Sequence, residues 1–405
     1  MSTDRNFGAA LRRSLAACAG LCVATLLSAC GGEGATAASS NVPAQTSLSP
    51  EAALGQRIFS DPTLSASSRQ SCASCHAESN GHGPDNALAV QLGGASLDLQ
   101  GNRSAPSINY LSANTAFYFA DDGTPTGGFF WDGRATSLQD QASHPLLAPN
   151  EMANGSKADV VAKLSRAAYA DEFRSVFGAD IFTRADEAFD RLTLALQAYQ
   201  REDTDFRAFS SKYDDFLRGK VALSDAEMRG LTLYNNPNKG NCQACHPSAR
   251  NTDGSFPLFT DFSFDNLGVP RNIALTQNAD PAYYDLGLCG RADVATHAEL
   301  CGAFKVPSLR NVALRHAYFH NGRFDNLKDA LRFYVQRDTN PEKWYPLDAD
   351  GKVKKFDDLP TRYHGNVNTS EVPYNRKPGD APALSDSEID ELIAFLRTLS
   401  DGYKR

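Results

Sequence analysis

The most restrictive feature of this sequence is a five-residue pattern that occurs twice. CASCH (residues 72–76) and CQACH (residues 242–246) both have the form Cys-x-x-Cys-His and start 170 positions apart. Two thiols one helical turn apart can each form a thioether to a porphyrin edge, and the next residue then presents an imidazole to the iron. A zinc ribbon requires cysteine pairs about 15–20 residues apart, and a dithiol redox pair requires no following histidine. We therefore predict two covalently bound haem c groups, with His76 and His246 as iron ligands; the attachment residues are Cys72, Cys75, Cys242 and Cys245.

The N-terminus has the features of an export signal. Three arginines within residues 1–14 precede residues 15–29 (LAACAGLCVATLLSA), an uncharged apolar run too short to span a bilayer comfortably. The run ends in LSAC, which resembles the bacterial lipoprotein box and predicts cleavage before Cys30 and lipidation of that cysteine. Simple secretion after a nearby cleavage is the alternative. Residues 30–48 are mostly small and polar, as in a flexible tether, so we expect an exported, periplasmic protein that meets the membrane only through a lipid anchor.

The composition bounds the size and the partners. The chain has 405 residues, 41% hydrophobic and 22% charged, and is long enough for two domains with separate cores. Its formal charge of −8 becomes −10 when residues 1–29 are removed, because they carry three arginines and one aspartate. An acidic protein of this kind is a poor nucleic-acid binder, so we expect no nucleic-acid partner.

The remaining cysteines predict one disulfide. Cys18 and Cys22 leave with the signal, and Cys30 is the predicted lipid site. Cys289 and Cys301 are then the two that remain, and in an exported protein they are expected to pair. The short closed loop would contribute about 3 kcal/mol of stability. Two free buried thiols are the alternative.

The fold class is predicted as mainly α: two cytochrome c-like haem domains with long loops. Helical patterns with N-terminal capping chemistry precede each haem motif, at residues 49–59 and 223–234, and another capping box begins at Ser385. Residues 156–218 also have helical patterns, whereas alternating strand patterns are scarce. We place the N-terminal haem domain at residues 49–218 and the C-terminal one at residues 219–405.

The residue opposite each histidine decides function, because an open iron face can activate a small oxidant and a closed one transfers electrons. After signal removal the methionines are Met152 and Met228, and Met228 is expected beside the second haem rather than over its far face. Met152 could serve the first haem, which would suit an electron carrier. In LKDALRFY (residues 327–334), Tyr334 shares one helix face with apolar residues and, on this pattern alone, is an ordinary core tyrosine.

Longer motifs show a resemblance that covers most of residues 50–400. They are FFWDGRATSLQDQASHPLLAPNEM (residues 129–152) and FKVPSLRNVALRHAYFHNG (residues 304–322), the latter followed by LKDALRFY. With the two haem motifs, the sequence resembles the bacterial di-haem cytochrome c peroxidases and their MauG-like relatives. The resemblance implies a peroxide-reacting haem at His76 and a second haem at His246. It also implies that Trp131 relays electrons between them and that Gln141 and Glu151 bind peroxide and move its proton.

The resemblance assigns Tyr334 to the second haem. Common peroxidases place a methionine fourteen residues after the histidine of the YFHxG motif, MauG-like members place a tyrosine there, and here His320 is followed at that distance by Tyr334. A phenolate ligand favours oxidised iron, whereas methionine raises the potential. The resemblance thus implies a periplasmic enzyme that reacts with hydrogen peroxide and oxidises a small redox-protein donor or a protein substrate. A non-catalytic, lipid-anchored di-haem electron carrier is the alternative.

Three departures from the family pattern qualify what the resemblance implies. Residues 90–106 lack the histidine that blocks the peroxide site in classical members, so we expect the first haem to be open, and His82 is interpreted as a loop residue. Gly240 stands where the methylamine-utilisation enzyme has the tryptophan that oxidises its protein partner. The family's calcium ion between the haems is in doubt because Ser104, Arg315 and Ala317 replace asparagine, threonine and proline, although main-chain carbonyls could still ligate.

Overall fold

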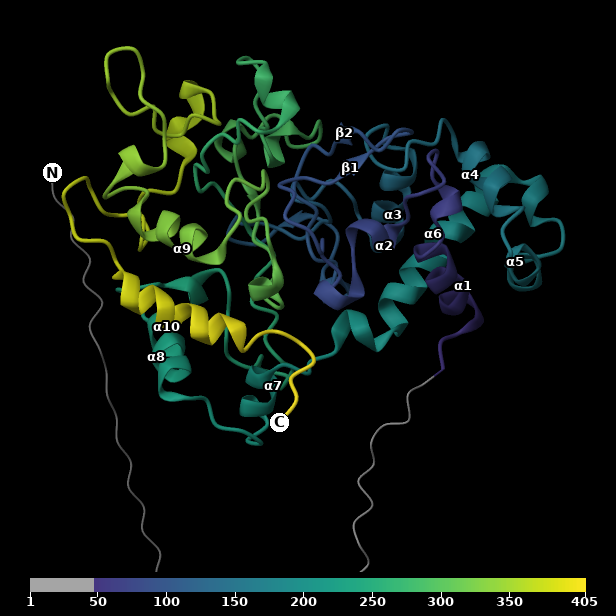
Figure 1. The fold of residues 1–405 in the computed structure, drawn as a ribbon, viewed down its shortest axis with the longest axis horizontal. Coiled ribbons are helices and arrows are strands. Elements are labelled where there is room, and N and C mark those ends of the chain that lie inside the picture. Colours follow the sequence, from purple (N-terminus) through teal and green to yellow (C-terminus); the bar gives the residue numbers. More distant parts are fainter. Residues whose placement is uncertain (1–46) are drawn as a thin grey trace, which may run out of the picture. The chain divides into compact units, whose positions relative to one another are not determined.

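Helices supply most of the regular structure in the computed structural model, which describes residues 47–405 (Figure 1). The predicted signal peptide, Cys30 and nearly all of the predicted tether lie outside this range. The helices are α1 (Pro50–Phe59), α2 (Cys72–Cys75), α3 (Leu138–Leu147), α4 (Lys157–Leu164), α5 (Ala170–Phe177), α6 (Ala185–Glu202), α7 (Lys212–Leu217), α8 (Asp225–Asn235), α9 (Leu327–Gln336) and α10 (Asp386–Arg397). The mainly helical class predicted from the sequence is confirmed.

Strands are short and pair locally. Each of the three antiparallel ladders in residues 47–405 has two strands of two residues. These ladders connect segments of long loops and do not form a core sheet. The strands are β1 (Leu92–Gly93) with β2 (Leu99–Gln100), β3 (Tyr118–Phe119) with β4 (Pro125–Thr126), and β5 (Phe264–Asp265) with β6 (Phe304–Lys305). No helix in the described part of the chain has the length and hydrophobicity needed to span a membrane.

The predicted helix starts agree with the observed ones because the capping residues are satisfied. The side chain of Ser49 accepts a hydrogen bond from the Ala52 amide, with Pro50 at the first helical position. Ser224 and Ser385 each form a complete capping box with the glutamate three residues later. Such caps supply partners for amides that the helix leaves unpaired.

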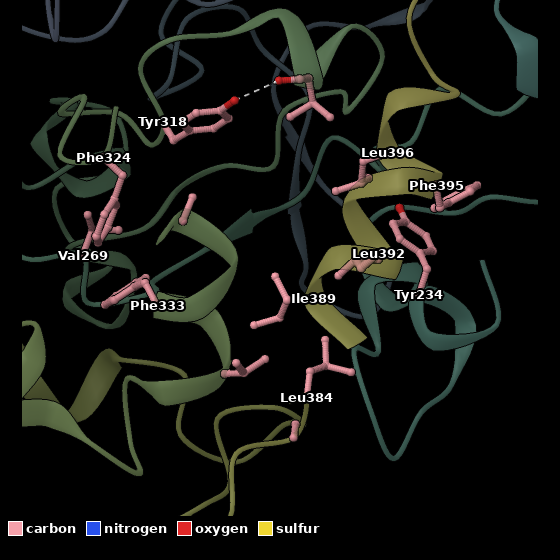
Figure 2. Packing of buried hydrophobic residues seen from close by; sticks show 14 of the residues in the cluster. Tyr234, Val269, Tyr318, Phe324, Phe333, Leu384, Ile389, Leu392, Phe395 and Leu396 are labelled. Carbon is pink, nitrogen blue, oxygen red and sulfur yellow. Dashed lines mark hydrogen bonds between the residues drawn. The ribbon is translucent and has the colours of Figure 1, made fainter. Parts of the chain in front are cut away.

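The described residues contain two large hydrophobic cores. The first is built from residues of α1 and α3–α6 together with neighbouring loops, and the second from residues of α7–α10 and the loops around them. Figure 2 shows part of the second core, where Ile389, Leu392 and Leu396 of α10 lie across from Phe333 of α9. Tyr213 of α7 packs in this second core although it precedes the predicted boundary at residue 219, and the division into domains stays a prediction.

Each core contains a helix pair that meets at a glycine. α1 packs on α6, and α8 packs on α10, as Figure 1 shows. A Cβ added at Gly55 would lie 2.0 Å from the carbonyl oxygen of Ala195, and one added at Gly230 would lie 2.1 Å from that of Glu391. Backbone atoms of a packed helix cannot move away as a flexible side chain can. A Cβ at either position would therefore clash with the facing helix, and the crossings require glycine.

The long loops are fixed by a few buried links. The predicted disulfide between Cys289 and Cys301 is formed. In a second link, the Arg310 guanidinium donates two hydrogen bonds to the Asp214 carboxylate (3.0 and 2.9 Å) and one to the carbonyl of Pro257. Arg310 and Asp214 are almost fully buried, so this pair ties α7 to the Arg310 segment, 96 residues further along the chain.

We predict that Gly55→Ala destabilises the protein by about 1–3 kcal/mol, the usual cost of overpacking a core contact. Alanine favours a helix by about 1 kcal/mol over glycine, so any loss measured by urea denaturation reports the steric cost at Ala195. Gly365→Ala is the control, because a Cβ at Gly365 meets no atom within 4 Å. Equal stability of Gly55→Ala and wild type would contradict the close helix crossing.

Candidate active site

Both haem-binding motifs line one interior cavity of about 660 Å³, with walls that are mainly apolar. The part of the second core drawn in Figure 2 supplies one section of the wall, including Leu392 and Leu396 of α10. Every site residue predicted between residues 72 and 334, the disulfide apart, lines this cavity: Cys72, Cys75, His76, Trp131, Gln141, Glu151, Cys242, Cys245, His246 and Tyr334. The fold thus brings together residues that are up to 262 positions apart in the sequence, from Cys72 to Tyr334.

The His76 imidazole is oriented by the main chain. Its Nδ1–H donates to the carbonyl oxygen of His82 (3.1 Å), which leaves Nε2 free to bind a metal. The His82 backbone has φ +50°, an uncommon value for a residue with a side chain, so the acceptor is held by a strained turn. Burial lowers the pKa of His76 to about 4, which keeps the ring neutral at physiological pH.

His246 is held in the same way. Its Nδ1–H donates to the carbonyl oxygen of Phe259 (2.7 Å), and Phe259 also has a positive φ, +55°. Burial lowers the pKa of His246 as well. The two motifs therefore present equivalent imidazoles, each with a neutral ring and an available Nε2.

The side chain of His82 agrees with its interpretation as a loop residue. Its ring stacks on Phe206 with centroids 3.9 Å apart, and its Nδ1 is 2.7 Å from the Asn109 side-chain oxygen. The function of this residue lies in its carbonyl, which accepts from His76.

The four motif cysteines fit thioether attachment. Among residues 47–405 they are the cysteines outside the disulfide, and each stands at the cavity wall. Burial is the main reason why the thiol pKa rises to about 12 in Cys72, Cys242 and Cys245 and to about 11 in Cys75. Two thiols and an oriented imidazole at each of two places on an apolar wall are the donor set that haem c requires.

The wall beside the first motif carries an acid and an amide. Gln141 lies on α3, and Glu151 follows the end of that helix, where its amide donates to the carbonyl of Ala148. Burial raises the pKa of the Glu151 carboxyl, and Arg134 partly offsets the rise. Glu151 is also near enough to raise the pKa of the Cys75 thiol. A proton-accepting group thus lies close to the first attachment site.

Trp131 is held by one hydrogen bond from its indole and one to its main chain. Its Nε1–H donates to the carbonyl oxygen of Ser104 (2.8 Å), and its own carbonyl accepts from the Lys305 amide (2.8 Å). The Lys305 ammonium donates to the carbonyl of Gly128, in the turn that leads to Trp131. Burial lowers the pKa of Lys305 to about 7. The indole is therefore held rigidly in a wall that both motifs share.

A largely buried ion network lines the same cavity as the two motifs. Arg103 donates to both carboxylate oxygens of Asp285 (2.7 and 2.8 Å) and to Asp132 (2.7 Å). The Arg103 guanidinium also lies over the Phe304 ring, which stacks on His320 with centroids 3.5 Å apart. Burial lowers the pKa of His320 to about 3, so this ring adds no charge to the network.

Tyr334 faces the cavity from α9. It shares the wall with Leu327, Ala330 and Leu331, the residues that the helical spacing places on its face. Burial, reinforced by the nearby motif thiols, raises its pKa above the ordinary value for tyrosine. Its ring lies 5.5 Å from that of Phe319 and 6.1 Å from that of Tyr374.

The comparisons with known proteins identify the family. The family profile described as di-haem cytochrome c peroxidase matches residues 49–222. The chain is 35% identical to the methylamine utilization protein MauG of Paracoccus denitrificans, over 86% of this chain and 88% of that protein. It is 32% identical to the cytochrome c551 peroxidase of Nitrosomonas europaea, over 76% and 82% of the two chains. The chain belongs to the di-haem cytochrome c peroxidase and MauG family, whose members are haem-containing oxidoreductases.

A solved structure supports the same assignment. The crystal structure of the di-haem peroxidase BthA from Burkholderia thailandensis is similar with a TM-score of 0.80 and 39% sequence identity, over 87% of this chain and 86% of that one. The protein is therefore an enzyme of the cytochrome c peroxidase and MauG-like class, and membership implies two c-type haems.

We predict that Asp285→Asn costs about 3 kcal/mol at neutral pH, because it leaves the buried Arg103 without its bidentate partner. Burial alone would raise the pKa of Asp285, but Arg103 overrides it and lowers the pKa to about 2. The pair therefore stabilises the fold above the ordinary aspartate range and loses this contribution as the pH falls towards 2. Thermal unfolding at several pH values should show a flatter acid dependence for Asp285→Asn than for wild type. The exposed Asp186→Asn is the control, and an unchanged acid dependence in Asp285→Asn would contradict the prediction.

Proposed function

We propose that this protein uses hydrogen peroxide at the part of the cavity beside residues 72–76 and oxidises an external donor from the other part. The observation that carries the proposal is the Glu151 carboxyl, partly buried at the cavity wall next to the first attachment site with its pKa raised. A carboxyl whose pKa is raised binds a proton more readily than an ordinary glutamate does, which suits it to general acid–base catalysis.

The residues beside the first motif are proposed to have separate roles in the reaction with peroxide. Haem bound there supplies the iron chemistry that cleaves the O–O bond. The Gln141 amide can hydrogen-bond a peroxide in the cavity and hold it beside the acid. A Glu151 carboxylate oxygen can accept the proton of one peroxide oxygen and deliver it to the other, which then leaves as water.

Trp131 is proposed to relay electrons between the two motifs. Its side chain lines the cavity that both motifs share, and an indole between two redox centres shortens each electron hop. Its hydrogen bond to Ser104 supports this role, because a fixed ring keeps the hopping distance constant.

Tyr334 is proposed as the second protein ligand at the His246 side. It lies fourteen residues after His320 on a helix that faces the cavity, near Cys242 and Cys245. Ligation by the phenolate would release the hydroxyl proton and leave the oxygen free to bind the iron. A phenolate there would favour oxidised iron and allow oxidising equivalents to be stored.

The donor is proposed to be a small redox protein or a protein side chain, in a periplasmic setting with Cys30 as the lipid anchor. Both kinds of donor are compatible with the names of the two relatives, one a cytochrome c551 peroxidase and one a methylamine utilization protein. Gly240 occupies the position of the tryptophan that serves the methylamine-utilisation enzyme, so this chain would use another exit route.

Stopped-flow mixing of the oxidised holoenzyme with peroxide should give a rapid spectral change at both haems, and an unchanged spectrum would refute the proposed function. Glu151→Gln should slow this reaction by about 100-fold or more, the usual contribution of a general acid–base residue. Glu172→Gln on α5 is the control, because that side chain is exposed and outside the cavity. A Glu151→Gln rate equal to wild type would remove Glu151 from the mechanism.

The pH dependence separates proton transfer from a structural role. Only the ionised carboxylate accepts a proton, so the wild-type rate should fall as the pH drops through the raised pKa of Glu151. The residual rate of Glu151→Gln should lack this acid limb. A raised pKa also means that ionisation at neutral pH disfavours the folded state, so Glu151→Gln should unfold no earlier than wild type.

Tyr334→Phe should change the ligation signature of the second haem in electron paramagnetic resonance and absorption spectra, and leave that of the first unchanged. Tyr374→Phe is the matched control, because it removes a buried hydroxyl from a ring 6.1 Å away. A Tyr334→Phe spectrum identical to wild type would refute the ligand assignment.

A further inference from the structure

The Arg315 side chain spans two segments that are far apart in the sequence. Its Nε–H donates to the carbonyl oxygen of Ala317 (3.2 Å), and one terminal nitrogen donates to the carbonyl of Ala105 (3.1 Å) and, more weakly, to the Ser104 hydroxyl (3.4 Å). The other terminal nitrogen lies beside Gly83, in the loop that orients His76. The guanidinium thus links the Ser104–Ala105 segment to its own segment, through Ala317, at the cavity wall.

This cation is held by neutral oxygens. Among the ion pairs formed within residues 47–405, none includes Arg315. Burial lowers its pKa to about 10, so it remains cationic at neutral pH. A positive charge surrounded by carbonyl and hydroxyl oxygens is the arrangement that a bound metal cation would otherwise create.

The same residues do not fit a calcium ion. Calcium takes six to eight oxygen ligands at about 2.3–2.6 Å, several of them usually carboxylates. Ser104, Arg315 and Ala317 offer three main-chain carbonyls and one hydroxyl, fewer oxygens than calcium requires. All four already accept hydrogen bonds: the Ser104 carbonyl from the Trp131 indole, the Arg315 carbonyl from the Tyr318 hydroxyl, and the other two oxygens from the guanidinium. No group of three or more histidine, cysteine, aspartate or glutamate side chains within residues 47–405 could hold a metal ion. The calcium that the family resemblance implied therefore has no suitable donor set here.

We propose that the Arg315 guanidinium takes the place of a calcium ion where the Ser104–Ala105 segment meets residues 315–317. The guanidinium then fixes the Ser104–Ala105 segment, and this segment in turn fixes Trp131. A charge carried by the chain cannot dissociate, so this link is permanent where a metal link would depend on ion concentration.

The path from Arg315 to Trp131 consists of a few bonds. Arg315 holds Ser104 and Ala105 from one side, and the Ser104 amide donates to the carbonyl of His320 (2.7 Å) on the other. The Ser104 carbonyl, fixed between these contacts, accepts the Trp131 indole N–H. Arg315 is therefore a positioning residue that acts on the indole through one peptide unit.

The first test uses the wild-type holoenzyme and no substitution. The protein is purified in calcium-containing buffer and then dialysed with or without EGTA. Elemental analysis should find calcium well below one ion per chain, and the melting temperature should be the same in both samples. One retained calcium per chain, or a lower melting temperature after EGTA, would overturn the proposal.

The second test reads the indole directly. The chain has two tryptophans, Trp131 and Trp344, and the Trp344 N–H has no hydrogen-bond partner within residues 47–405, so the indole marker bands in ultraviolet resonance Raman spectra separate them. In a Trp344→Phe background, Arg315→Gln should shift the Trp131 band towards a weaker hydrogen bond and lower the melting temperature. Arg315→Lys, which keeps the charge, should shift it less.

The control is Arg323→Gln, an exposed arginine in a nearby loop, which should leave the Trp131 band in place. An Arg315→Gln band identical to wild type would overturn the positioning role. If Arg315→Gln does not fold, the Arg315→Lys spectrum and the wild-type chelation result still decide the question. Neither readout requires a reaction with peroxide, so failure here is separable from failure of the proposed function.

Discussion

The site depends on two hydrogen bonds between an imidazole and a main-chain carbonyl. His76 donates to His82 and His246 donates to Phe259, and in both cases the acceptor sits on a residue with positive φ. A carbonyl fixed in this way selects one tautomer and one ring direction before any metal is bound. The fold therefore fixes the orientation of both histidine rings before haem is attached. The cysteines and the other cavity residues act around these two fixed rings.

Both halves of the cavity contain the same imidazole–carbonyl hydrogen bond, but different residues line the wall near each motif. Near the first motif the wall carries an acid of raised pKa, Glu151, together with the Gln141 amide. Near the second motif it carries the buried hydroxyl of Tyr334 among aromatic rings. Trp131 and the Arg103 network also line the cavity, with a hydrogen-bonded indole and paired charges. One scaffold thus places an acid beside one motif and a phenol beside the other, the arrangement that the proposed function uses.

Much of this could be predicted from the sequence, because the signals are local. The haem motifs follow from covalent chemistry, the helix starts from capping residues, and the disulfide between Cys289 and Cys301 from export and elimination. The carbonyls of His82, Phe259 and Ser104 could not be predicted, since any residue has a carbonyl and only the fold aims it. Arg315 was visible as a departure from a calcium pattern, but its guanidinium contacts required three-dimensional structure.

The glycine crossings bear on how such a chain could arise. In each half, the helix before the haem motif meets a later helix so closely that one backbone touches the other, at Gly55 in α1 and at Gly230 in α8. Finding the same unusual contact at equivalent places is what duplication of a single ancestral unit would leave behind. The helix crossings and the imidazole–carbonyl bonds occur in both halves, whereas Glu151 and Tyr334 each occur in one half alone. Evolution of a new activity in this family would accordingly be sought in the walls that face the irons.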